Sequence, residues 1–202
     1  AKNYKDFSSS FNSPFYYILS KITSFTIGNE VEHIPAYLCY GMSNLTKVNY
    51  LGTVDKWGKF DFKNYYDNPI YYAKNLYING ELLTDLKITS VNTIKKYAFY
   101  KASSLENVTM NDYIGEIGDY AFASCPSLES VTLTDTVENL GWEIFADTPF
   151  INNTNNYDND GVLYLNYNLI ATQPFGDKES YNILPGTEAV AGGAFEWNSL
   201  KK

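Results

Sequence analysis

Cysteine and histidine are scarce in this chain of 202 residues, which contains two cysteines and one histidine. Two cysteines are too few for a disulfide framework or a cysteine-based metal site. We expect Cys39 and Cys125 to be free thiols, because they fall two units apart in the internal repeat, roughly 9–10 Å by strand spacing, and a disulfide needs Cα atoms within about 7 Å. His33 is expected to face solvent, whereas Cys39 falls at an inward position, which argues against a Cys–His nucleophilic pair. We therefore expect no enzymatic activity, no cofactor and no metal site.

Positive charge and long apolar runs are also lacking. The formal net charge is −8, and nucleic acids and anionic membrane surfaces bind through basic clusters. No apolar run reaches the roughly 18 residues of a membrane-spanning helix. The composition therefore argues against nucleic acid as a partner and against membrane insertion of this segment.

An internal repeat is the main positive signal, with a period of about 23 residues, a length typical of solenoid proteins. Phe99, Phe122 and Phe145 are equally spaced, and Ile94, Ile117 and Leu140 recur at the same interval. With two interruptions, the aromatic position extends to six units, at Tyr16, Cys39, Phe99, Phe122, Phe145 and Phe195.

The length of the repeat predicts its packing. A unit this short cannot bury its own apolar side, so it must stack on its neighbours. Each unit contains one short strand, such as Val108–Met110 or Val131–Leu133. We expect an α/β fold, a right-handed solenoid with a parallel sheet on one face and short helical or irregular corners on the other. The phenylalanines would form a continuous aromatic column inside the coil.

The repeat units resemble those of the BspA-like (Treponema-type) leucine-rich repeat family. The resemblance rests on LESVTLTDTVENL from Leu128, IGDYAFASC from Ile117 and IKKYAFYKA from Ile94. It implies a leucine-rich-repeat solenoid from a bacterial surface or secreted protein, in a family associated with adhesion and binding to host matrix proteins. Departures include Cys39 in place of phenylalanine.

Residues 1–202 are expected to form a single leucine-rich-repeat domain, a fragment of a larger protein, with insertions at about 49–85 and 152–176. In the first insertion, Asn68-Pro69 favours a helix start and Asn79-Gly80 a hairpin turn. In the second, GVLYL and NLIAT are expected to form another hairpin.

The polar stretch before that second hairpin has a partial likeness to a calcium-binding loop. Asn156, Asp158, Asp160 and Gly161 match the start of the pattern, but Tyr167 stands where the acidic ligand at position twelve is needed. We therefore favour a role in hairpin entry over calcium binding.

Two groups of residues are candidates for contact with a partner. The first comprises outward positions of the strands, Thr26, Asn49, Lys87, Thr109, Thr132 and Asn182. The second comprises aromatic residues of the insertions, Trp57, Tyr65, Tyr66, Tyr71, Tyr72, Tyr164 and Tyr167. We expect a protein ligand to lie on the sheet face and to be anchored by whichever of these aromatics are exposed.

The function predicted from these features is non-catalytic protein recognition or adhesion by a bacterial surface or secreted protein. Family resemblance places the chain at the cell surface or outside the cell, with host extracellular or cell-surface proteins as candidate ligands. The acidic balance favours a basic partner. The alternative is a carbohydrate-binding module that uses the insertion aromatics.

Overall fold

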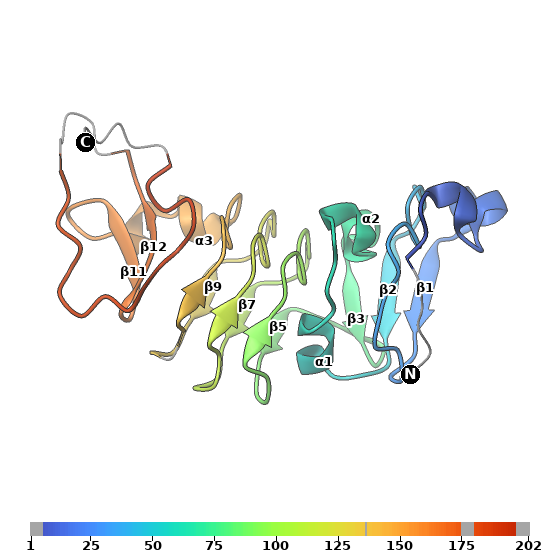
Figure 1. The fold of residues 1–202 in the computed structure, drawn as a ribbon, viewed down its shortest axis with the longest axis horizontal. Coiled ribbons are helices and arrows are strands. Elements are labelled where there is room, and N and C mark those ends of the chain that lie inside the picture. The colour runs from blue at the N-terminus through green and yellow to red at the C-terminus, as the bar shows by residue number, and fades with distance from the viewer. Residues whose placement is uncertain (1–5, 136, 175–179, 197–202) are drawn as a thin grey trace.

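The computed structural model describes residues 6–135, 137–174 and 180–196. In this part of the chain, the fold is an elongated stack of coils with mixed α and β structure, few helices and no closed barrel. Strands β1, β2, β3, β5, β7 and β9 follow one another along the long axis (Figure 1). A hairpin of β11 and β12 lies at the end opposite β1.

The helices are short because each occupies a corner of a coil. Within the described residues, the α-helices are α1 (Val54–Gly58), α2 (Ile70–Ala73) and α3 (Pro149–Asn152). The 3₁₀ turns are η1 (Ser10–Asn12), η2 (Tyr16–Lys21), η3 (Tyr65–Asp67) and η4 (Thr154–Asn156). The strands are β1 (Ser24–Ile27), β2 (Lys47–Tyr50), β3 (Leu76–Ile78), β4 (Glu81–Leu82), β5 (Asp85–Lys87), β6 (Thr93–Ile94), β7 (Asn107–Thr109), β8 (Glu116–Ile117), β9 (Ser130–Thr132), β10 (Asn139–Leu140), β11 (Val162–Leu165), β12 (Asn168–Thr172) and β13 (Ala189–Val190).

The strands expected to form one sheet are divided into two groups. Strands β1, β2 and β3 pair in parallel, with Thr26 beside Asn49 and Asn49 beside Tyr77. Strands β5, β7 and β9 pair in parallel as well, with Lys87 beside Thr109 and Thr109 beside Thr132. The division arises because β3 turns back into β4, which pairs with it antiparallel and takes the edge position.

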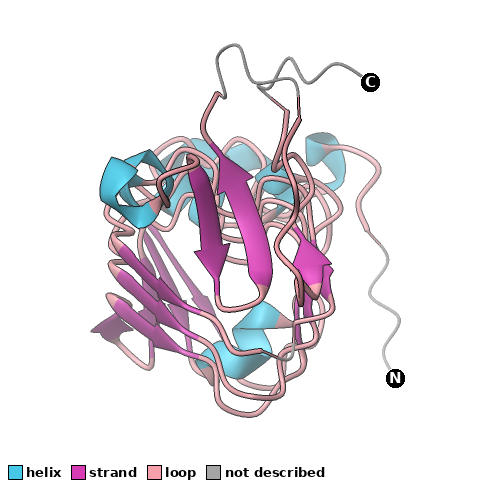
Figure 2. Cartoon of the chain, turned by 90° about the vertical axis from the view of Figure 1, so that its left-hand side faces the viewer, coloured by secondary structure: helices cyan, strands magenta, loops and turns pink. Residues whose placement is uncertain are grey.

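The opposite face of the coil carries strands that were not expected. Two-residue strands β6, β8 and β10 pair in parallel, with Ile94 beside Ile117 and Ile117 beside Leu140. Figure 2 shows strands on two opposite sides of the coil when it is seen end-on. The isoleucine and leucine column of the repeat therefore marks a second line of strands rather than irregular corners.

The aromatic column is continuous over three coils. Phe99 and Phe122 stack with ring centroids 5.3 Å apart, and Phe122 and Phe145 with centroids 5.6 Å apart. The column expected from the sequence had six units, but the ring stack ends at Phe99 on one side and at Phe145 on the other. Trp57 is buried on the side of the first insertion, and Phe150 from α3 meets Phe145 edge-on at 5.6 Å. Tyr16 and Phe195 are only half-buried.

Glycines allow neighbouring coils to approach closely. A Cβ atom added to Gly118 would lie 2.5 Å from the backbone nitrogen of Lys96. One added to Gly141 would lie 2.4 Å from the backbone nitrogen of Asp119. These distances are well below van der Waals contact, so the spacing of the coils depends on the missing side chains.

Both insertions form the hairpins expected of them. Asn79 and Gly80 adopt positive φ angles of 52° and 91° between β3 and β4, as a type I′ turn requires. The Asn68 side chain accepts a hydrogen bond from Ile70 N at 2.9 Å and so begins α2. Helix α1 was not foreseen; Thr53 caps it by accepting from Lys56 N.

In the second insertion, β11 and β12 pair antiparallel. The Asp158 carboxylate accepts from Asp160 N and Val162 N, both at 2.9 Å, which is a turn at the hairpin entry. Residues 175–176, the last two assigned to this insertion, lie outside the described residues.

The two cysteines and the single histidine are packed or bonded within the fold. Cys39 and Cys125 are free and fully buried, and burial raises the pKa of each thiol to about 12. His33 is half-buried rather than freely exposed, and its Nε2 lies 3.1 Å from Asp6 Oδ1.

Replacing Phe122 by alanine is expected to lower the free energy of unfolding by about 3–5 kcal/mol, because the ring is sandwiched between two others. Phe11→Ala, at a side chain 73% exposed, is the control and should change little. Denaturant titration of both variants measures the difference. Equal stabilities would contradict a supporting role for the column.

Gly118→Ala is expected to destabilise the fold by about 1–3 kcal/mol, because the added methyl group forces two coils apart. Gly28→Ala is the matched control, since a Cβ there meets nothing within 4 Å. Thermal melts followed by circular dichroism compare the two. A melting temperature lowered equally by both substitutions would rule out the close approach as the cause.

Candidate functional site: a tyrosine cluster

Nine tyrosines form one network of ring contacts, which we call the tyrosine cluster. Neighbouring ring centroids lie between 5.0 and 6.3 Å apart. Its members are Tyr37, Tyr40, Tyr65, Tyr66, Tyr71, Tyr72, Tyr97, Tyr100 and Tyr120. Four come from the first insertion and five from the corners of the repeats, so two separate parts of the sequence build one surface.

Left-handed backbone at the corners aligns the repeat tyrosines. Tyr97 and Tyr120 have φ angles of 60° and 53°, a region that costs a residue with a Cβ about 1–2 kcal/mol. Hydrogen bonds to the following coil stabilise it: Tyr97 N donates to Asp119 O at 3.0 Å and Tyr120 N to Trp142 O at 2.8 Å. The two phenol rings consequently stack, with centroids 5.6 Å apart and planes 8° apart.

Tyr37 adopts the same conformation, with φ 61°, but its neighbour is the insertion rather than another coil. The buried Asp67 carboxylate replaces the missing carbonyl, because Oδ1 accepts from Tyr37 N at 3.0 Å. The other oxygen, Oδ2, accepts from Asn64 N at 3.0 Å and so caps η3. One side chain therefore connects the first repeat corner to the insertion.

Two further side chains connect the insertion to the Tyr97 corner. Asn68 Nδ2 donates to Tyr97 O at 2.7 Å and to Ala98 O at 3.1 Å. Trp57 Nε1 donates to Ala98 O at 2.8 Å, and its side chain is fully buried. The expectation that Trp57 contacts a partner is therefore wrong: this residue belongs to the core, where its indole N–H finds a backbone acceptor.

An open pocket of about 510 Å³ lies within the cluster. Among the described residues, its lining consists of Gly41 and six tyrosines, Tyr37, Tyr40, Tyr65, Tyr66, Tyr71 and Tyr72. Tyr40 and Tyr65 are 43% and 41% exposed, and Tyr66, Tyr71 and Tyr72 are half-buried. The pocket thus offers aromatic edges and hydroxyl groups without a charged side chain in its wall.

Two lysines stand beside this pocket. Lys101 Nζ lies 4.6 Å from the Tyr71 ring centroid and 5.5 Å from that of Tyr100. Lys74 Nζ lies 5.0 Å from the Tyr71 centroid and donates to Tyr71 O at 2.5 Å. Burial and the nearby Lys101 charge lower the pKa of Lys74. Within the described part of the chain, neither ammonium forms an ion pair.

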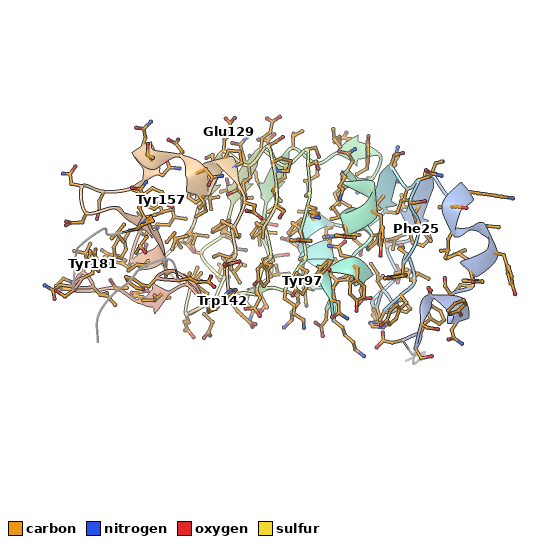
Figure 3. The ribbon with its side chains drawn as sticks, turned by 90° about the horizontal axis from the view of Figure 1, so that it is seen from above. Phe25, Tyr97, Glu129, Trp142, Tyr157 and Tyr181 are labelled. Atoms are coloured by element: carbon orange, nitrogen blue, oxygen red, sulfur yellow. The ribbon has the colours of Figure 1, made fainter. Side chains whose placement is uncertain are left out.

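The strand positions predicted to contact a partner lie elsewhere. Thr26, Lys87, Thr109 and Thr132 are exposed, and Asn49 is half-buried with Oδ1 accepting from Gly80 N. Figure 3 shows Tyr97 on one long side of the coil and Glu129, which precedes the strand of Thr132, on the other. A ligand that touches both groups must reach around the coil.

The remaining candidates are scattered. Asn182 is exposed but lies outside any strand. Tyr164 is half-buried, and its hydroxyl accepts from Leu184 N at 3.2 Å, which anchors the following loop. Tyr167 is 51% exposed at the hairpin turn. The structure does not bring these three residues into the tyrosine cluster.

Sequence reasoning missed the repeat-borne half of the cluster. It assigned binding to the insertion tyrosines and left out Tyr37, Tyr40, Tyr97, Tyr100 and Tyr120. A signal was present, because Tyr97 and Tyr120 are separated by one repeat period and each stands at the same short distance before a core phenylalanine. The outward direction of that position follows from its left-handed backbone, which the repeat pattern alone does not reveal.

The described residues lack two other kinds of feature. Among them, no three or more histidine, cysteine, aspartate or glutamate side chains come together as metal ligands. In the same part of the chain, no helix is both long and apolar enough to cross a membrane.

Comparison with known families agrees with the repeat architecture. The pattern of the BspA type leucine rich repeat region matches residues 9–81 and 70–170, with six copies. The chain belongs to the BspA-type leucine-rich repeat family. The matched residues run through the first insertion, which carries four of the clustered tyrosines. No curated protein matches the chain significantly.

Two solved structures show limited similarity. A leucine-rich cell surface protein from Faecalibacterium prausnitzii A2-165 is 16% identical, with a TM-score of 0.38, over 62% of this chain and 45% of that one. The pneumococcal vaccine antigen PcpA is 21% identical, with a TM-score of 0.35, over 89% of this chain and 44% of that one. This chain spans less than half the length of either structure.

Stability is expected to fall in alkali as the clustered phenols ionise. A hydrogen bond with the Tyr37 side chain, together with burial, raises the pKa of Tyr66 from 10.0 to about 12, and burial raises that of Tyr72. Because the pKa of Tyr66 is higher in the folded state than in the unfolded state, its protonated hydroxyl stabilises the fold. This contribution is complete below pH 10 and is lost as the pH rises through about 12.

Urea titrations from pH 8 to pH 12 measure this dependence. Tyr66→Phe should make the decline shallower, because it removes one late-ionising hydroxyl. Tyr113→Phe, at a side chain 72% exposed and outside the cluster, should not. A decline of identical slope in the parent and Tyr66→Phe would contradict the assignment.

Proposed function

We propose that this chain is a non-catalytic protein-recognition module of a bacterial surface or secreted protein, located at or outside the cell surface. Membership of the BspA-type leucine-rich repeat family supports a surface interaction module. The coil is taken to be right-handed, since about 98% of parallel crossover connections are. Its ligand is a protein, with host extracellular or cell-surface proteins as candidates.

The observation that carries this proposal is the tyrosine cluster. Tyrosine provides large contact area at low conformational cost, and binding hot spots are enriched in it. Here six tyrosines line one open pocket, and Tyr40 and Tyr65 each expose about two fifths of their surface. Their rings are fixed by contacts with one another, which reduces the entropy lost on binding.

Carbohydrate binding is the alternative, because aromatic rings also stack on sugars. The geometry favours a protein for two reasons. The lining rings meet at steep angles, such as 84° between Tyr40 and Tyr66 and 80° between Tyr65 and Tyr66, and so do not form one flat platform for a sugar ring. In addition, the described pocket wall has no amide or carboxylate side chain to pair with sugar hydroxyls.

Binding to a panel of immobilised extracellular-matrix and cell-surface proteins, alongside a glycan array, tests the proposal. We expect hits on the protein panel, and we expect Tyr40→Ser with Tyr65→Ser to weaken them by about tenfold or more, as loss of hot-spot residues does. Thr109→Ala with Thr132→Ala tests the strand face predicted from the sequence, and Tyr113→Ser, 72% exposed and outside the cluster, is the matched control. Hits confined to glycans would replace the proposal by the carbohydrate alternative.

A further inference from the structure

The two lysines beside the tyrosine pocket need an explanation in a chain of net charge −8. Lys74 and Lys101 are both half-buried, and the lowered pKa of Lys74 reflects burial next to a like charge. Each ammonium lies over the ring of Tyr71, with no carboxylate partner among the described residues. Two ammonium groups therefore stand at the Tyr71 side of the pocket, whereas the buried Asp67 carboxylate, beside Tyr37, is already bonded to backbone N–H groups.

This local charge restricts what the pocket can accept. An aromatic cage often binds a cation, but here the ring of Tyr71, which lines the pocket, already has two ammonium groups over it. A lysine or arginine side chain from a partner would meet like charges without a compensating carboxylate in the pocket wall. An acidic group placed next to the pocket would instead pair with Lys101 and Lys74.

The pocket itself suits an uncharged, extended and rigid segment. Proline-rich chains in the polyproline II conformation dock between aromatic side chains and lose little entropy on binding. Their backbone carbonyls have no internal hydrogen-bond partners, so they accept from tyrosine hydroxyl groups. Burial raises the pKa of Tyr72, so its phenol is protonated and able to donate throughout the physiological range, whereas the Tyr66 hydroxyl is already engaged with the Tyr37 side chain.

We propose that the tyrosine pocket binds an extended proline-containing segment of a partner protein, with an adjacent aspartate or glutamate of that segment at Lys101 and Lys74. The proposal rests on the protein-recognition function above and specifies its ligand class. It differs from the basic partner that overall charge favours, because recognition depends on the charges within reach of the pocket.

Fluorescence anisotropy with three labelled peptides tests the charge and the proline requirement separately. The first peptide has six prolines followed by two glutamates, the second has two lysines in place of the glutamates, and the third has glycine and serine in place of the prolines. The first should bind most tightly. The other two should each bind about tenfold more weakly, the loss expected when one contributing contact is removed.

Variants locate the binding site. Lys101→Gln keeps most of the length of the side chain and removes its charge; it should weaken the acidic proline peptide and abolish its preference over the basic one. Tyr40→Ser should weaken both proline peptides. Lys59→Gln, at an exposed lysine outside the cluster, and Tyr113→Ser, 72% exposed and outside the cluster, are the matched controls and should leave affinity unchanged. Circular dichroism confirms that each variant is folded.

The outcomes separate this inference from the proposed function. The inference is overturned if the acidic and basic proline peptides bind equally tightly. It is also overturned if the glycine–serine peptide binds as tightly as the acidic proline peptide. Binding of an extracellular protein with no binding of the proline peptide also overturns it and leaves protein recognition intact. Binding that survives both Lys101→Gln and Tyr40→Ser places the peptide elsewhere and rejects the pocket as its site.

Discussion

The fold depends on hydrogen bonds that run from the corner of one coil to the corner of the next. Phe99 N donates to Ala121 O, and Phe122 N donates to Ile144 O, with distances of 2.8 and 2.9 Å. These bonds set the separation at which the phenylalanine rings stack. Equivalent bonds donated by Tyr97 N and Tyr120 N hold these two residues in the left-handed conformation that directs their rings outward. The same backbone contacts thus order the hydrophobic interior and the aromatic exterior of the coil.

The first insertion interrupts the repeat in sequence but continues the stack in space. Its strand β3 pairs with β2 as the next coil would, and its buried Asp67 accepts the hydrogen bond that a neighbouring carbonyl would accept. Asn68 and Trp57 then fix it to the following corner. Because the insertion is tied at both sides, its tyrosines meet those of the repeats at defined angles. The shape of this surface accordingly depends on the junctions as well as on the rings.

The regular spacing of the repeat made the stacked phenylalanines and the inward cysteines predictable, and turn chemistry did the same for the first hairpin. The period fixes which residues share a column, and Asn-Gly fixes a turn type by its backbone requirements. The division of the strands could not be read from the period, because it depends on β4 returning beside β3. For the candidate site, Tyr65 and Tyr66 were singled out from the sequence and do lie in the tyrosine cluster, whereas Trp57 was expected at the surface and is buried. Composition says that an aromatic is present, whereas only packing decides whether its ring faces the core.

The use of Asp67 in place of a backbone carbonyl has a consequence for how such proteins diversify. A backbone carbonyl is present whatever the sequence, so the hydrogen bonds that Tyr97 N and Tyr120 N donate to the next coil do not depend on which residue supplies the acceptor. The contact between Tyr37 and the insertion is instead encoded by one side chain. An inserted segment carrying an acidic residue at that point is accepted by the stack, and one without it leaves a donor unmet. The insertion therefore joins the stack through a few specific side chains, Asp67 at one corner and Asn68 with Trp57 at the next, and its other positions can change while the coils stay the same.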